Sequence, residues 1–190
     1  MVPTTNAQRS DRTRSILLTQ ATLLFADQGW AETSTQAVID ACNLTKGALY
    51  HHFSDKTDLF RAVFEQVNKD LLEHIIREAH QHADPTEALV AGCRAYLAAA
   101  AEPAVARIYL LDGPAVLGWA RWREIDARFC LGSLREGVAA ALGHSDEPLT
   151  LALSGAMNEL ALACAEGQVS TANAQHAIES LVRASIAALK

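Results

Sequence analysis

Apolar residues recur three and four positions apart along most of the chain, which is the spacing of an α-helix with one buried face. Ser, Thr or Asp precedes many of these stretches, and Gly or Asn follows them, as at helix starts and ends. Strict alternation of apolar and polar residues, which would predict strands, does not occur. The predicted helices span about residues 11–28, 33–42, 46–52, 56–79, 85–101, a short piece between 103 and 112, 115 or 119 to 142, 147–166 and 170–189.

Three small helices precede the long helix at residues 56–79, and several more helices follow it. We therefore predict an all-α protein of about nine helices in two parts. Residues 1–56 form a three-helix domain, called the head below, and residues 57–190 form a larger domain, called the body. The long helix would join the two parts.

The composition supports helices and limits the partners. Half of the residues are hydrophobic, and the 190 residues include only 10 Gly and 5 Pro, which argues against sandwiches, barrels and disordered chains. The net charge is −6, and residues 1–60 hold five Lys or Arg against six Asp or Glu. A nucleic acid would therefore be bound by a few placed cations and not by a strongly basic surface.

Cysteine spacing and hydropathy limit the cofactors and the location. Cys42, Cys93, Cys130 and Cys164 form no CxxC pair, so neither a zinc ribbon nor a redox motif is predicted. The first residues are polar, unlike a signal peptide, and the apolar stretches are interrupted well before 18 residues. We expect no metal, no cofactor, no membrane span and a cytoplasmic location.

The helices predicted within residues 33–52 are joined by a short turn at Cys42-Asn43-Leu44, which is a helix-turn-helix pattern. The second helix begins with small or cationic residues, as does a helix end that approaches base edges in a major groove. These residues are Thr45, Lys46, Gly47 and Ala48. Ordinary packed helices show similar features, so the pattern by itself leaves DNA binding and plain packing both open.

A longer stretch is more specific. Residues 12–64, and above all the run TKGALYHHFSDKTDLF at residues 45–60, resemble the N-terminal DNA-binding domain of TetR/AcrR-type transcriptional regulators without a gap. The resemblance implies an all-helical homodimer with a three-helix DNA-reading head. It also implies a larger C-terminal body that binds a small ligand and dimerises. The run IYLLDGPAVLGWARWREIDARF resembles the body of one branch of these regulators.

The resemblance implies DNA-contacting roles residue by residue. Thr33 or Ser34 matches the phosphate-contacting cap of the second helix, and Gln36 matches a position that often reaches DNA. The base-reading helix end corresponds to Thr45, Lys46, Gly47 and Ala48. The phosphate contacts correspond to Tyr50, His51 and Lys56. Departures from the family's usual pattern, at Thr35, Ala37, Ile39 and Asn43, leave the architecture intact but do not allow an operator sequence to be transferred.

The body offers candidates for a ligand pocket. Trp119, Trp122 and Asp126 fall on one side of the helix predicted to end at residue 142, with Phe129 one turn further. Tyr96 and Asn158 place single polar groups on apolar helices. We predict an effector that is mainly hydrophobic or aromatic with one or two polar groups, and Asp126 would allow a cationic one. The alternative for Asp126 is a structural ion pair with Arg123, or exposure at the edge of the aromatic stripe.

The last two predicted helices suggest a dimer interface. The helix at residues 147–166 is apolar almost all round, which implies burial on two sides. The final helix has an apolar stripe at Ile178, Leu181, Val182 and Ile186. Two helices from each subunit would form a four-helix interface, in which Ala161 would lie.

The function predicted from these features is a ligand-responsive transcriptional repressor that binds double-stranded operator DNA as a homodimer. Two alternatives belong to other classes of protein. A small helical enzyme is disfavoured because no nucleophile–base pair, phosphate loop or metal spacing is found. A dimeric scaffold with a degenerate head is disfavoured by the small-residue face at residues 45–48.

Overall fold

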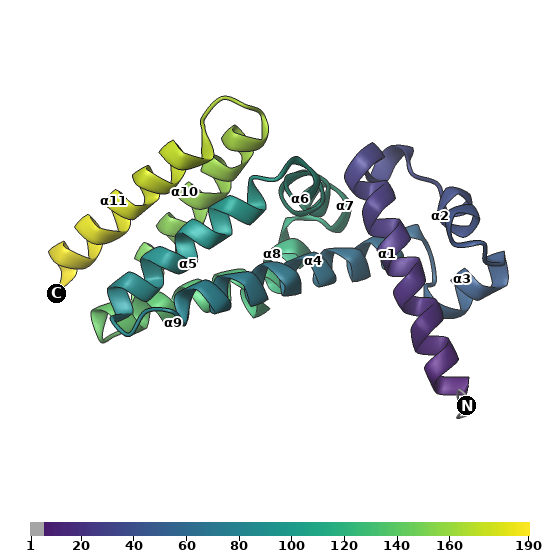
Figure 1. The fold of residues 1–190 in the computed structure, drawn as a ribbon, viewed down its shortest axis with the longest axis horizontal. Helices are drawn as coiled ribbons and strands as arrows, with labels where there is room; N and C mark the ends of the chain where they lie inside the picture. The colour runs from purple at the N-terminus through teal and green to yellow at the C-terminus, as the bar shows by residue number, and fades with distance from the viewer. Residues whose placement is uncertain (1–5) are drawn as a thin grey trace.

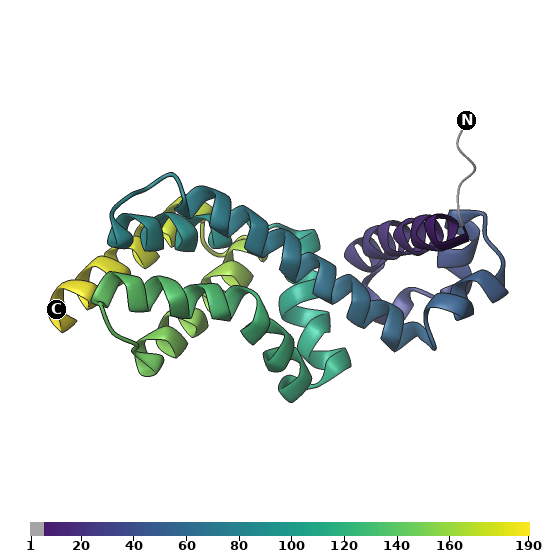
Figure 2. The same cartoon turned by 90° about the horizontal axis from the view of Figure 1, so that it is seen from below.

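The head lies at one end of the molecule and the body at the other, with one long helix running between them (Figure 1). The computed structural model describes residues 6–190, and that range consists of helices and connecting turns without a strand. The described residues begin in the head and end at the far tip of the body (Figures 1 and 2). The predicted all-α class is confirmed.

The head consists of α1 (Asn6–Glu32), α2 (Thr35–Cys42) and α3 (Lys46–His52). The N-cap of α2 is Ser34, whose hydroxyl accepts a hydrogen bond from Ala37 N at 3.0 Å. The N-cap of α3 is Thr45, which accepts from Ala48 N at 3.2 Å. Asn43 adopts the left-handed conformation expected in the turn, with φ at 52°. Local capping therefore sets both helices where the sequence predicted them.

The first helix begins earlier than predicted, and its helical geometry breaks directly after its predicted end. It begins at Asn6 and not near residue 11, so that the cations Arg9, Arg12 and Arg14 are exposed side chains on a helix. Its helical geometry is interrupted at Gly29, where φ is 81°. That backbone conformation strains any residue with a Cβ, so Gly29 is required at this bend.

The connecting helix α4 (Lys56–Ala79) begins and ends as predicted, and Asp55 caps it. One side of its whole length is buried, at positions that include Leu59, Phe60, Val63, Phe64, Val67, Leu71 and Ile75. The Phe60 ring meets Phe25 of α1 edge-on at 5.3 Å between centroids. Because the buried stripe continues from the head into the body, a division near residue 56 remains a proposal.

The body is built around α5 (Pro85–Ala100), which packs against α4, α9, α10 and α11. Between α5 and α8 lie α6 (Pro103–Ala106), the π-helical segment η1 (Arg107–Asp112) and α7 (Gly113–Leu117). The remaining helices are α8 (Trp119–Arg128), α9 (Cys130–Leu142), α10 (Glu147–Ala165) and α11 (Thr171–Leu189). Figure 2 shows α9 running beside α4 in the body.

The single helix predicted to end at residue 142 is wrong, because the chain breaks between α8 and α9. Phe129 has φ −123° and ψ −103°, which no helix allows. Gly132 permits the break, since a Cβ there would lie 2.7 Å from the carbonyl oxygen of Ala127. Gly132 is the sequence feature that marks this bend. It could not be recognised from the sequence, because the need for glycine arises from the contact with Ala127, five residues earlier.

The last two helices pack differently from the prediction. Ile178, Val182 and Ile186 are buried against the chain's own body, and Ala161 is fully buried, so these residues do not form an outer stripe. The outer side of the pair instead exposes Leu151 and Leu181 among other residues. Among the described residues, α10 is the unbroken helix long and apolar enough to cross a membrane, and only 28% of that stretch is buried. An apolar outer face on this helix therefore needs an explanation.

Candidate functional site

The N-terminal end of α3 presents a small, exposed surface. Thr45, Lys46 and Gly47 are exposed, while Ala48 is half-buried. A Cβ built on Gly47 would meet only the Thr45 hydroxyl, at 3.9 Å, so the space in front of it is open. Leu49 on the opposite side is fully buried in the head core. The helix therefore offers its backbone and small side chains to a close partner such as the floor of a major groove.

Aromatic and basic groups flank this surface. Tyr50 is 43% exposed, and the Lys46 ammonium lies 5.9 Å from the centre of its ring. His51 is exposed beside it. These three side chains share the outer side of the head and carry donors suited to phosphate oxygens.

The structure separates the two cap candidates on α2. Ser34 is exposed and caps the helix, whereas Thr33 is 1% exposed and donates its hydroxyl to the Gly29 carbonyl at 2.8 Å. The expectation that Thr33 contacts DNA is therefore wrong in this conformation, because its side chain is inside the head. Gln36 is exposed and donates to Asp40 at 2.7 Å.

Lys56 is engaged within the head. Its ammonium donates to the Ala31 carbonyl at 3.3 Å and lies 4.1 Å above the centre of the Trp30 ring. Desolvation lowers its pKa from the ordinary lysine value, and the nearby Glu32 and Asp112 carboxylates oppose that shift. If Lys56 binds a DNA phosphate, its ammonium must do so while also contacting the Ala31 carbonyl and the Trp30 ring.

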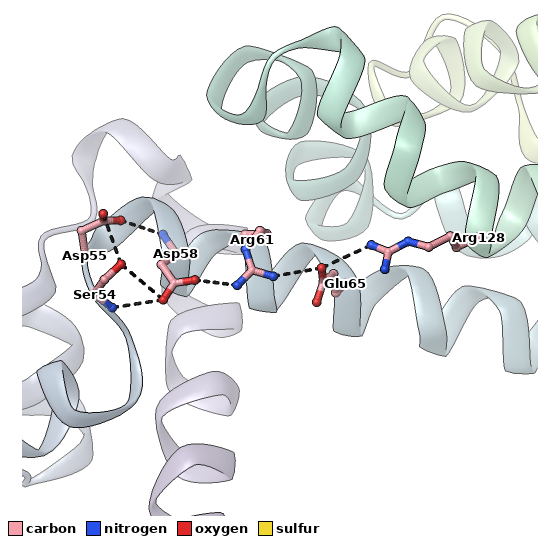
Figure 3. A network of polar contacts seen from close by, with 6 residues as sticks. All are labelled: Ser54, Asp55, Asp58, Arg61, Glu65 and Arg128. Atoms are coloured by element: carbon pink, nitrogen blue, oxygen red, sulfur yellow. Dashed lines mark hydrogen bonds and ion pairs between the residues drawn. The ribbon is translucent and has the colours of Figure 1, made fainter.

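A chain of polar contacts runs from the head along α4 to the body (Figure 3). Asp58 accepts from the backbone N–H of Ser54 at 3.0 Å and from Arg61 at 2.6 Å. These two donors lower the pKa of Asp58. Arg61 also binds Glu65, which Arg128 of α8 reaches at 3.4 Å. Such partly exposed pairs contribute about 0.2–1 kcal/mol each, so the chain is a weak connection.

A cavity of about 680 Å³ that opens to the surface lies in the body between α4, α5, the α8–α9 bend and α10. Much of its wall is apolar and includes Leu72, Ile75, Leu89, Phe129, Leu134 and Met157. The sequence-predicted residues Tyr96, Asp126 and Asn158 also line it. Three side chains from three different helices therefore meet at one cavity, as predicted.

Two pairs of polar side chains in the cavity wall bond one another. Tyr96 donates its hydroxyl to the side-chain oxygen of Asn158, and Tyr109 donates to Asp126 at 2.6 Å. Burial raises the pKa of both tyrosines well above the usual value. Both hydroxyls therefore stay protonated and act as neutral hydrogen-bonding groups.

Asp126 is 2% exposed and fully paired. Besides Tyr109, it binds Arg123 at 3.0 Å, and Arg123 also donates to the Ser154 hydroxyl at 3.3 Å. Burial raises the pKa of Asp126, while the bonds to Tyr109 and Arg123 oppose the shift. The structural alternative, in which Asp126 pairs with Arg123, is thus present in the structure.

The two tryptophans do not line the cavity, which corrects their prediction. Trp122 is buried, and its indole N–H donates to the Tyr109 carbonyl at 2.8 Å. Trp119 is 63% exposed and stacks on Trp122. Sequence reasoning missed Tyr109, whose apolar neighbours gave no sign that η1 would turn its hydroxyl toward Asp126.

The sequence also predicted that the chain has no metal site and that its cysteines are small buried groups. No cluster of three or more His, Cys, Asp or Glu suited to a metal ion occurs within residues 6–190. Cys93 and Cys130 line the cavity, and burial raises the pKa of Cys93 to about 12 and that of Cys130 further. Both thiols are therefore neutral and behave as small apolar groups.

Comparisons with known proteins match both parts of the chain. The family described as "Bacterial regulatory proteins, tetR family" matches residues 17–63, and "Tetracyclin repressor-like, C-terminal domain" matches residues 86–185. A solved TetR-family transcriptional regulator from Pectobacterium atrosepticum is 31% identical, with 97% of each chain covered and a TM-score of 0.76.

Two curated relatives match mainly through the head. HTH-type transcriptional regulator AcrR of Shigella flexneri is 41% identical over 58 residues, which are 30% of this chain and 27% of that protein. HTH-type transcriptional repressor KstR2 of Mycolicibacterium smegmatis is 33% identical over 84 residues, which are 44% of this chain and 38% of that protein. The chain thus matches well under half the length of these relatives. All three proteins are named as regulators of transcription, a class that is not enzymatic.

Proposed function

The chain belongs to the tetR family of bacterial regulatory proteins, and from this premise we propose that it is a DNA-binding repressor. It binds a near-palindromic operator as a homodimer in the cytoplasm and is released by a small, largely hydrophobic effector. The observation that carries the DNA-binding part is the open N-terminal end of α3, where Gly47 faces free space beside Thr45 and Lys46.

The DNA-contacting side chains proposed here are those that the head exposes. Base edges are read from the start of α3, and phosphates are bound from Ser34, Gln36, Tyr50 and His51. Lys56, at the start of α4, binds a further phosphate with the ammonium that also donates to the Ala31 carbonyl. Few cations take part, so the affinity depends only moderately on salt.

The proposal is tested by binding of the purified protein to duplexes that tile the DNA flanking its own gene. One duplex should bind at least about 10³-fold more tightly than a random duplex of equal length. Gly47→Leu should abolish that preference, and Gly47→Ala should weaken it less, while both keep the wild-type helix content because the site is open. An unchanged preference in Gly47→Leu would refute the proposed docking.

The dimer is proposed to form through the outer sides of α10 and α11. Leu151, Ala152 and Gly155 of α10 are exposed, as are Leu181 and Ala184 of α11. Nothing lies within 4 Å of a Cβ built on Gly155, although glycine in a helix interior costs about 0.5–1 kcal/mol relative to alanine. Close approach by a second copy explains both the glycine and the exposed apolar side. The two heads would then contact successive major grooves on one face of the DNA.

The effector is proposed to occupy the cavity that Tyr96, Asp126 and Asn158 line. Its volume lies within the usual range of about 300–1,000 Å³ for ligand pockets. Arg123 already neutralises Asp126, so the buried carboxylate is not free to pair with an ion. The charged lining residues Arg128 and Glu136 are exposed to solvent. We therefore infer an uncharged effector with a hydroxyl or carbonyl group, and not a cationic one.

Three probes of similar size separate these possibilities: 4-butylphenol, 4-butylbenzylamine and 4-butylbenzoate. Binding to the folded state raises the melting temperature, and at equal concentration the tighter ligand raises it more. The neutral phenol should raise it most, and cavity-filling Ser154→Phe should remove the effect. A larger rise with the amine would show that Asp126 is available to a cation and would overturn the neutral-effector proposal.

A further inference from the structure

The π-helical segment η1 touches both the cavity and the head. Tyr109, in its middle, lines the cavity and binds Asp126. Asp112, its last residue, accepts a hydrogen bond from the backbone N–H of Trp30 at 2.7 Å. Six residues therefore join the proposed effector site directly to the end of α1, and α4 is not part of this connection.

The head is closely fitted to η1 at this contact. The positive φ of Gly29 turns the chain so that the Trp30 N–H points at Asp112. A Cβ on Gly29 would lie 3.2 Å from the Arg107 guanidinium and 3.5 Å from the Asp112 carboxylate. The first and last residues of η1 therefore both press against the bend in α1.

The interior of η1 leaves little room for Tyr109 to move alone. The Tyr109 ring stacks on Phe64 of α4 at 5.7 Å, and its carbonyl accepts from the Trp122 indole. A Cβ on the following Gly113 would lie 2.9 Å from both Phe64 and Trp122. A movement of Tyr109 would therefore be passed on to the rest of η1, because close-packed interiors transmit strain. Single π-helical turns are also frequent at functional sites.

The contact between the head and η1 leaves one buried hydrogen-bond donor, on the Trp30 side chain, without a partner. Its indole N–H is buried and, among residues 6–190, meets no acceptor. A buried donor without a partner favours any rearrangement that supplies one. The contact between Trp30 and η1 can therefore adopt two arrangements. In one the backbone N–H of Trp30 is bonded to Asp112, and in the other that bond is broken and the indole N–H gains an acceptor.

We propose that η1 couples the cavity to the head: an effector that takes the Tyr109 hydroxyl from Asp126 shifts η1 and loosens the bond between Asp112 and Trp30. This inference rests on the proposed function, because it assigns the regulation of the same cavity. An effector acts through this route only to the extent that it binds the two arrangements differently.

The competing route is the polar chain on α4 in Figure 3. It also starts beside the cavity, since Arg128 lines the cavity and binds Glu65. Its side chains are partly exposed, with 53% for Arg128 and 31% for Glu65, so water and salt weaken each link. The Tyr109–Asp126 bond of η1 is buried and the Trp30–Asp112 bond is half-buried, so η1 is the stiffer connection.

Residue-resolved hydrogen exchange tests the coupling without DNA or effector. Asp112→Ala removes the acceptor and should speed exchange of the Trp30 amide about tenfold. Tyr109→Phe removes a hydroxyl from the cavity and should speed the same amide about threefold or more through η1. Tyr96→Phe is the matched control, because it removes the other cavity hydroxyl from α5 and should leave the Trp30 amide unchanged.

Several results would overturn the coupling. These are equal Trp30 exchange in Tyr109→Phe and Tyr96→Phe, no change in Asp112→Ala, or acceleration by Arg128→Gln instead. Exchange of core amides in α1, such as Ala21, shows whether each variant remains folded. If Tyr109→Phe is unstable, Asp126→Asn weakens the same bond from the α8 side and should speed the Trp30 amide as well. Failure to find an operator would remove the proposed function but would leave these exchange results unaffected.

Discussion

The hydroxyl of Tyr109 donates a 2.6 Å hydrogen bond to the carboxylate of Asp126, and both side chains are at most 2% exposed. Asp126 comes from α8 and Tyr109 from η1, so the bond ties two separate elements at the cavity wall. Burial raises the pKa of the carboxyl, although Arg123 and Tyr109 both favour its charged form. A charge on this carboxyl is therefore costly to bury, and its two partners offset part of the cost.

The raised pKa of Asp126 predicts a pH dependence of stability. The folded chain binds this proton more tightly than the unfolded chain, so Asp126 makes stability fall as pH rises from about 3.9 to the raised folded-state pKa. Asp126→Asn removes that dependence. The free energy of unfolding of the variant minus that of wild type should therefore rise with pH across this window and then level off. Urea unfolding at several pH values measures it, and a difference that falls with pH would contradict the assignment.

Asn43 predicts a stability effect in the head. Its φ of 52° is left-handed, and a β-branched residue there should cost about 1–2 kcal/mol of stability. Asn43→Val should lower the melting temperature, while Asn43→Gly, which adopts this conformation readily, should not. Thermal unfolding followed by circular dichroism compares the two. Equal melting temperatures would mean that the turn relaxes to another conformation.

The proposed dimer predicts a separation of association from folding. Leu181 is 43% exposed on α11, so Leu181→Glu should yield folded monomers in sedimentation at micromolar concentration. Leu23→Glu is the matched control, because Leu23 is 59% exposed on α1, away from α10 and α11, and should remain dimeric. Ala161→Arg does not test the interface, since Ala161 is buried inside one chain and its replacement should unfold the body. A monomeric wild type would remove the dimer from the proposal.

Lys46 predicts a change in salt dependence. Its exposed ammonium at the start of α3 should neutralise one phosphate, which contributes a slope of about −0.9 to the dependence of log affinity on log salt. Lys46→Gln should reduce the slope by about this amount. Lys69→Gln, which changes an exposed lysine on the body part of α4, should not alter it. Titrations at several salt concentrations with one duplex decide between these outcomes.

The head was predictable because its signals are local. Ser34, Thr45 and Asp55 each accept a hydrogen bond from the backbone N–H three residues further on, so both partners lie within one short stretch of sequence. The helix bounds at residues 46–52 and 56–79 matched the structure for this reason. The same local reading could not tell that Thr33 would turn inward to the Gly29 carbonyl, because that depends on how α1 bends.

The sequence by itself determined that the chain is helical, where most helices begin and end, and which short helix presents small residues, because helix caps and apolar periodicity act over a few residues. Only the tertiary structure decided which side chains share the cavity, since Tyr96 and Asn158 are 62 positions apart. It also decided that Trp122 packs inside while Trp119 stays exposed, and which side of α11 remains free. Those outcomes depend on the packing of distant helices, which no local pattern specifies.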